Sequence, residues 1–127
     1  GHLVVGHGNT VKGQTSCVLS SMGSKVQTHF GGVCVGGYEN LVNGQSAVVI
    51  GGMNNSATGD FSATVAGVSS QSNGFASMVQ GGQFCRADGN FSVVSGGFGN
   101  LADGYGAWVG GGEWNRAEGW WSSAGMG

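Results

Sequence analysis

Small and medium-sized side chains alternate with polar ones in short runs along this chain, and glycines separate the runs. In "NSATGDFSATVAG", residues 55–67, one run places Asn55 and Ala57 two positions apart, and the next does the same with Ser62 and Thr64. A spacing of two is the period of a β-strand, whose side chains point alternately to opposite faces. The pattern therefore predicts pairs of short strands joined by glycine turns.

The alternating runs belong to a repeat of about fifteen residues, x-x-Asn-x-Ala-x-Gly-x-x-Ser-x-Val-x-Gly-Gly. The second unit has sixteen residues, and residues 1–6 form the tail of a further unit. Because the repeat fills the chain, we treat residues 1–127 as a single repeat domain. The units are 7–21, 22–37, 38–52, 53–67, 68–82, 83–97, 98–112 and 113–127.

Single glycines close the first strand of most units, and glycine pairs close the second. We expect the single glycines to be structural corners with positive φ, a conformation that glycine adopts freely. The sixteen-residue unit has Thr28 and His29 where its corner glycine should be, so we expect a bulge there; His is among the residues enriched at positive φ. The corner glycines are Gly13, Gly44, Gly59, Gly74, Gly89, Gly104 and Gly119.

A unit of two strands and two tight turns cannot bury a core alone, whereas stacked units hydrogen-bond in parallel about 4.8 Å apart. The predicted fold is an all-β, single-domain parallel β-roll, or β-solenoid, of about eight coils with two short strands each. The third, fifth, tenth and twelfth positions of each unit should face the core. Collagen is excluded, because collagen needs glycine at every third residue.

The outward positions of the two strands differ in polarity. On the first strand they carry seven of the chain's ten charged residues, so we expect that face to lie in water. On the second strand they form an apolar stripe too long to be left in water, which predicts a lengthwise interface between identical copies. The expected interface residues are Val33, Val35, Val48, Ile50, Val65, Met78, Val93 and Trp108.

Composition and charge narrow the classes of partner. The net charge is −2 and the chain has no basic run that could neutralise a phosphate backbone, so we expect no nucleic-acid partner. No apolar stretch is long enough to span a bilayer. We interpret Cys17, Cys34 and Cys85 as free thiols, because they have no metal-ligand spacing and Cys17 and Cys34 should point to opposite faces of the sheet.

The sequence contains no arrangement of nucleophile, base and orienting residue, so we expect no enzyme and no catalytic residue. His2, His7 and His29 are interpreted as surface or turn residues, and neither a metal nor a cofactor is expected. Aromatic residues gather in the last two units, and exposed rings suit sugar stacking or a protein contact. The candidate ligand-binding residues are Tyr105, Trp114, Trp120 and Trp121. The alternative is that these rings seal a trimer axis or cap the rod.

The units "NLVNGQSAVVIGG" (40–52), "NSATGDFSATVAG" (55–67) and "NLADGYGAWVGGG" (100–112) resemble the head repeats of trimeric autotransporter adhesins, and similar repeats resemble segments of phage tail fibres. The resemblance implies a left-handed β-roll, a homotrimer, and an extracellular place on a bacterial surface or a virion fibre. It implies a fibre segment or adhesin head that attaches to a cell-surface glycan or protein receptor. The alternatives are a tail-fibre segment or a purely structural, self-assembling fibre. Because the chain begins in mid-unit at "GHLVVG", we also expect coils to continue into neighbouring fibre domains.

Overall fold

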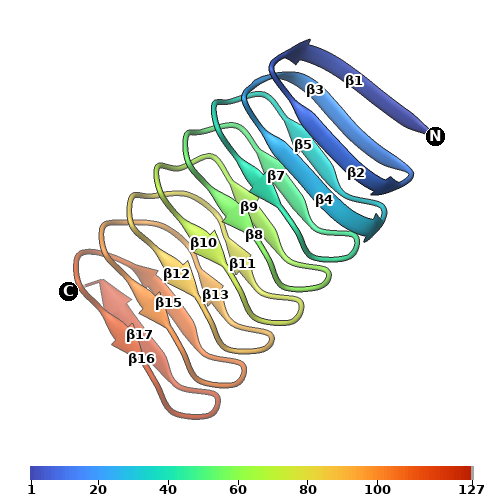
Figure 1. Ribbon diagram of the computed structural model, residues 1–127. Coiled ribbons are helices and arrows are strands. Elements are labelled where there is room, and N and C mark those ends of the chain that lie inside the picture. Colours follow the sequence, from blue (N-terminus) through green and yellow to red (C-terminus); the bar gives the residue numbers. More distant parts are fainter. Residues whose placement is uncertain (127) are drawn as a thin grey trace.

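The computed structural model describes residues 1–126 as a stack of flat coils built only from strands and turns (Figure 1). The chain alternates between two parallel sheets, so each coil contributes one strand to each. The odd-strand sheet contains β1 (His2–His7), β3 (Ser16–Met22), β5 (Val33–Val35), β7 (Val48–Ile50), β9 (Ala63–Val65), β11 (Met78–Val79), β13 (Val93–Val94), β15 (Trp108–Gly111) and β17 (Ser123–Met126). The even-strand sheet contains β2 (Thr10–Gln14), β4 (Lys25–Phe30), β6 (Leu41–Val42), β8 (Ser56–Ala57), β10 (Gln71–Ser72), β12 (Arg86–Ala87), β14 (Leu101–Ala102) and β16 (Arg116–Ala117).

All strands pair in parallel, and from β5 and β6 onward the register is fifteen residues. The N-terminal pairs β1–β3 and β2–β4 each contain a shift of register. In the odd-strand sheet, Met78 lies beside Val93, and Val93 lies beside Trp108. A third line of single bridges follows the turns after the odd strands, from Met22 beside Tyr38 to Phe98 beside Glu113. The register confirms the predicted β-solenoid of about eight coils. The final residue of the last unit, Gly127, lies outside the described residues.

The predicted bulge in the sixteen-residue unit is present. Lys12 pairs with Gln27 and Gln14 pairs with Phe30, so β4 contains one more residue than β2 over the same stretch. The positive φ expected for His29 is wrong, because His29 is not among the left-handed residues. The left-handed residue of this turn is Gly31, with a φ of 68°, at the position equivalent to the left-handed Ser46 of the next coil. Thr28 is buried and accepts a hydrogen bond at Oγ1 from the backbone N–H of Gly32 (3.2 Å).

The core is a thin layer of small side chains between the two sheets. Residues at the four predicted inward positions are buried in the middle coils, as in Asn55, Ala57, Ser62 and Thr64. Such small side chains let the sheets pack closely. The fully buried apolar members are Val18, Val26, Cys34, Val42, Ala47, Val49, Ala57, Val79, Cys85, Ala87, Val94, Ala102 and Val109.

Buried asparagines connect successive coils at the third position of the repeat. The Oδ1 atom of Asn100 accepts a hydrogen bond from the backbone N–H of Asn115 (2.8 Å), and its Nδ2 donates to the carbonyl oxygens of Gly96 (2.7 Å) and Gly112 (2.9 Å). Asn55 similarly accepts from the N–H of Ser70 (3.0 Å). Unpaired buried backbone groups are costly, so asparagine suits this position because it satisfies polar groups of the glycine turns. Serine partly replaces it in other coils, where Ser70 Oγ accepts a hydrogen bond from the backbone N–H of Cys85 (3.3 Å).

The single glycines lie at the turns, but the reason predicted for most of them is wrong. Among the seven, only Gly13 has a left-handed backbone, with a φ of 108°. A Cβ atom on Gly89 would lie 2.1 Å from the carbonyl oxygen of Gly104, and one on Gly44 would lie 2.0 Å from that of Gly59. These residues are therefore glycine because the next coil passes directly over them, and no side chain fits in the gap.

Candidate functional site

Each coil turns at two edges of the flat stack. We call the turns that follow the even strands, such as residues 89–91 and 104–106, the single-glycine edge. The turns that follow the odd strands, such as 96–99 and 111–114, form the glycine-pair edge. Turns on the single-glycine edge contain one left-handed residue in most coils, and turns on the glycine-pair edge contain two or three. These residues recur at the same positions from coil to coil.

Several of these left-handed positions hold large aromatic residues. Phe61, Phe91 and Trp121 on the single-glycine edge have φ of 58°, 58° and 56°, and Phe84 and Trp114 on the glycine-pair edge have φ of 56° and 57°. Bulky residues rarely adopt this conformation, which costs about 1–2 kcal/mol for a residue with a Cβ atom. The coil between Phe91 and Trp121 and the coil between Phe84 and Trp114 hold glycine at the equivalent position: Gly106 and Gly99 have φ of 64° and 65°. The chain thus places aromatic rings where glycine is the easier choice.

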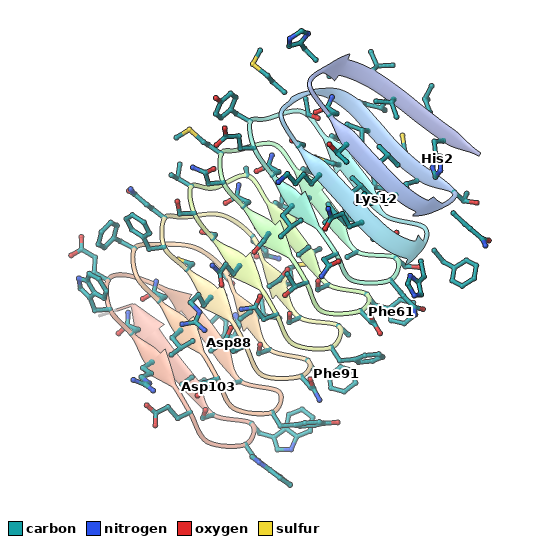
Figure 2. The ribbon with its side chains drawn as sticks, viewed as in Figure 1. His2, Lys12, Phe61, Asp88, Phe91 and Asp103 are labelled. Atoms are coloured by element: carbon teal, nitrogen blue, oxygen red, sulfur yellow. The ribbon has the colours of Figure 1, made fainter. Side chains whose placement is uncertain are left out.

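The rings of the single-glycine edge form a continuous series that we call the aromatic ladder. Phe61, Phe75 and Phe91 follow one another with ring centroids 5.6 and 5.7 Å apart, and Tyr105 lies 5.4 Å beyond Phe91. Most successive rings meet edge to face. Figure 2 shows Phe61 and Phe91 projecting from the same edge of the stack. The ladder consists of Phe61, Phe75, Phe91, Tyr105, Trp120 and Trp121, and all six are exposed.

The ladder alternates between two neighbouring positions of the repeat, which gives this edge a period of two coils. Phe75 is followed by a small residue, Ala76, whereas Phe91 is preceded by Asn90, whose Oδ1 accepts a hydrogen bond from the backbone N–H of Phe75 (2.9 Å). The small residue leaves room for the ring of the next coil. A Cβ atom on Gly106 would lie 2.4 Å from the Trp121 ring. The signal for this edge was therefore a thirty-residue period, which fifteen-residue columns taken singly conceal.

The four candidate ligand-binding residues separate into two groups. Tyr105, Trp120 and Trp121 lie together at the end of the aromatic ladder, with the Tyr105 ring 5.9 Å from Trp120 and 5.4 Å from Trp121. Trp114 lies on the glycine-pair edge, where it packs against Phe98 with a centroid distance of 5.3 Å. The sequence places these residues close together in number, but they occur in turns on opposite edges of the coil.

The predicted apolar stripe lies on the outer face of the odd-strand sheet and narrows toward the C-terminal coils. One column runs from Val33 through Val48 and Met78 to Val93 and Trp108. The second column holds Val35, Ile50 and Val65, and then changes to Gln80 and Ser95. The apolar side chains of the two columns are half-buried, except Ile50 and Trp108, which are 43% and 47% exposed. The Trp108 indole donates a hydrogen bond from Nε1 to Ser95 Oγ (3.1 Å).

The outer face of the even-strand sheet is polar, as predicted. Thr58 donates a hydrogen bond from Oγ1 to Asn73 Oδ1 (2.7 Å), and Asn73 Nδ2 donates to Asp88 Oδ1 (2.8 Å). Arg86 forms an ion pair with Asp88. Figure 2 shows Asp88 and Asp103 on this face. The two faces of the stack therefore differ sharply in polarity.

The three cysteines are free thiols, as expected. The strand register places Cys17 beside Val33 and Val18 beside Cys34, so the two cysteines occupy neighbouring columns that face opposite sides of the sheet. Burial raises the pKa of the Cys34 thiol, and hydrogen bonds from Ser24, Ser21 and Asn40 oppose that rise. Residues 1–126 contain no group of three or more His, Cys, Asp or Glu side chains placed to hold a metal ion.

Within the part of the chain that the structure describes, there is no helix long and apolar enough to cross a membrane. Comparison with protein-family models, with curated proteins and with solved structures gives no match to this chain.

Proposed function

We propose that this chain is a non-enzymatic fibre segment or adhesin head, which forms a trimeric rod and attaches to a surface glycan or protein receptor. Its place would be extracellular, on a bacterial cell or a virion fibre. The observation that carries the proposal is the aromatic ladder, a line of exposed rings over five successive coils. The solenoid that supports it is compatible with a fibre.

The energetics of the aromatic ladder favour a role in binding a ligand or a receptor. A left-handed aromatic residue costs about 1–2 kcal/mol, and an aromatic pair contributes roughly 0.5–1.5 kcal/mol beyond area burial. At the three left-handed positions, Phe61, Phe91 and Trp121, the backbone cost and the gain from ring pairing are of similar size and opposite sign. Trp120 and Trp121 remain 82% and 71% exposed. Large, stiff rings with one open face bind sugars and proteins with little loss of conformational entropy.

Attachment is tested by changing Trp120→Ala and Trp121→Ala together and measuring binding to a glycan array and to receptor-bearing cells. The matched control is Tyr38→Ala, which removes an aromatic residue that is 43% exposed at the glycine-pair edge. We expect the double variant to lose attachment and the control to retain it. Equal binding by the wild type and the double variant would contradict attachment through the ladder.

The trimer rests on the apolar stripe of the odd-strand sheet. Its half-buried valines, together with Ile50, form a lengthwise band that a second copy would cover. Light scattering should give a trimer for the wild type and a monomer for the double variant Val48→Asp with Ile50→Lys, because the variant buries unpaired charge at the interface. Changes at Lys25 or Asp103, on the polar face, should leave the trimer intact. A monomeric wild type at micromolar concentration would contradict this assembly.

A purely structural fibre, including a tail-fibre segment without a ligand, is the second candidate. The edge-to-face contacts between successive rings favour it, because such contacts connect neighbouring coils. On this alternative, the Trp120→Ala and Trp121→Ala variant unfolds at a lower urea concentration, and neither it nor the wild type binds a surface.

A further inference from the structure

A groove lies along the glycine-pair edge where this edge meets the even-strand sheet. Its volume is about 350 Å³. The lining residues come from three successive coils: Phe84 and Arg86, then Gly99 and Leu101, then Trp114 and Arg116, with Asn100 and Asn115 at the base. The groove is thus distinct from the aromatic ladder, which occupies the opposite edge.

The alternation of aromatic residues and glycine creates the groove. Phe84 and Trp114 are equivalent left-handed residues two coils apart, and the coil between them has Gly99, with a φ of 65°. A Cβ atom on Gly99 would lie 2.6 Å from Cε3 of Trp114, so the indole packs directly on the glycine backbone. Trp114 is still 70% exposed. Because Gly99 has no side chain, the groove stays open between Phe84 and Trp114, and the Trp114 ring remains accessible.

Two guanidinium groups flank the aromatic walls. Arg86 on β12 and Arg116 on β16 lie on either side of Leu101 on β14 in the strand register. Their side chains are 52% and 59% exposed. Each forms an ion pair with an acid two positions further along the chain, Asp88 and Glu118 respectively, and neither acid lines the groove. The lining of the groove therefore contains two cations and no anion, although each cation is paired with an acid outside the lining.

The ion pairs leave the guanidinium groups available to a ligand. Surface ion pairs contribute little to stability because water and salt screen them. A guanidinium group can donate two parallel hydrogen bonds to a carboxylate or a sulfate. The base of the groove is stiff, since buried Asn100 uses Nδ2 and Oδ1 in hydrogen bonds to Gly96, Gly112 and Asn115. The groove is thus formed before a ligand arrives.

We propose that this groove binds an anionic saccharide. A sugar ring packs against the exposed indole of Trp114, and the carboxylate or sulfate groups of the sugar chain accept hydrogen bonds from Arg86 and Arg116. The positive lining and the aromatic walls together fit this chemistry. This site goes beyond the proposed attachment through the aromatic ladder, which involves other residues and a different edge, and either can fail without the other.

The first test is a nuclear magnetic resonance titration of the full chain with three probes. An oligomer of galacturonic acid carries carboxylates, a heparin oligosaccharide carries sulfates as well, and a neutral cello-oligosaccharide carries neither. We expect one or both anionic probes to shift the backbone signals of Phe84, Gly99 and Leu101, and added salt to weaken the binding. Shifts with the galacturonic acid oligomer alone would identify a uronic acid as the ligand. Shifts with the heparin oligosaccharide alone would identify a sulfated sugar. Absence of these shifts with both anionic probes, or equal shifts with the neutral probe, would overturn the proposal.

The second test compares two variants that break the same ion pair. Arg116→Gln removes the cation, whereas Glu118→Gln removes the acid and leaves the cation in place. Loss of one charge-assisted hydrogen-bonding group weakens binding by roughly ten- to a hundredfold, so we expect that loss for Arg116→Gln. We expect equal or tighter binding for Glu118→Gln. Equal weakening in both variants, or undiminished binding in Arg116→Gln, would overturn the proposal; circular dichroism verifies that each variant is folded.

Discussion

Substitution of Gly89 by alanine tests how closely the coils stack. The added Cβ atom would lie 2.1 Å from the carbonyl oxygen of Gly104, 2.6 Å from its carbonyl carbon and 2.7 Å from the carbonyl oxygen of Asp103. To make room, the two coils must separate, which lengthens the backbone hydrogen bonds from Asp88 and Gly89 to Ala102 (2.9 and 3.2 Å). Overpacking costs about 1–3 kcal/mol and each weakened hydrogen bond about 1 kcal/mol. We expect Gly89→Ala to lower the free energy of unfolding by roughly 3 kcal/mol or more.

Gly119 provides the matched control for this substitution. It has the same position in the last coil, but a Cβ atom there would be 3.7 Å from the nearest heavy atom, Cβ of Ser122. Gly119→Ala should be neutral, or should stabilise the protein by up to about 1 kcal/mol by restricting the unfolded chain. Urea unfolding followed by circular dichroism measures both variants. Equal effects of the two substitutions would refute the argument that the single glycines are required by the coil that passes over them.

Three further variants test other parts of the structure. Asn100→Ala leaves buried backbone groups without partners, so urea unfolding should show a loss of about 2–4 kcal/mol, whereas Asn43→Ala on the polar face should change little. Phe91→Gly should be more stable than Phe91→Ala in the same assay, the reverse of the usual order in strands, because the φ of residue 91 is 58°. Because burial raises the pKa of Cys34 above its ordinary value of 9.0, the neutral thiol is favoured in the folded state. The stability advantage of wild type over Cys34→Ala should therefore be full well below pH 9.0 and should be lost as the pH rises above that value.

The repeat made the coil, its register and its core predictable from the sequence. Side-chain alternation identified residues such as Ala57 and Val94 as inward, and each is fully buried. The inward-facing positions of the repeat predict the core well, because each coil must pack against the previous one and this restricts the side chains at those positions. The extra residue near Thr28 likewise predicted the observed bulge, since a parallel register can absorb an additional residue only by local distortion.

The turns were less predictable because two separate requirements select glycine there: a positive φ, and close approach of the next coil. Gly99 and Gly106 have a positive φ, whereas Gly89 is glycine because the next coil packs closely on it. The sequence shows glycine in both cases and does not distinguish the two reasons. The edge on which a turn residue lies depends on a shift of only a few positions, so Trp114 and Trp121 are near in sequence yet lie on opposite edges. Pairs of units, rather than single units, carry the pattern of the aromatic ladder.

The central claim is that the aromatic ladder is the contact surface, and acrylamide quenching of tryptophan fluorescence tests it directly. In a Trp108→Phe and Trp114→Phe background, the emission comes from Trp120 and Trp121 alone, because the chain has four tryptophans. The measurement compares free protein with protein attached to a receptor-bearing surface. We predict that attachment lowers the quenching constant toward that of a buried ring, since both indoles are largely exposed in the free chain. An unchanged quenching constant in fully attached protein would contradict the claim.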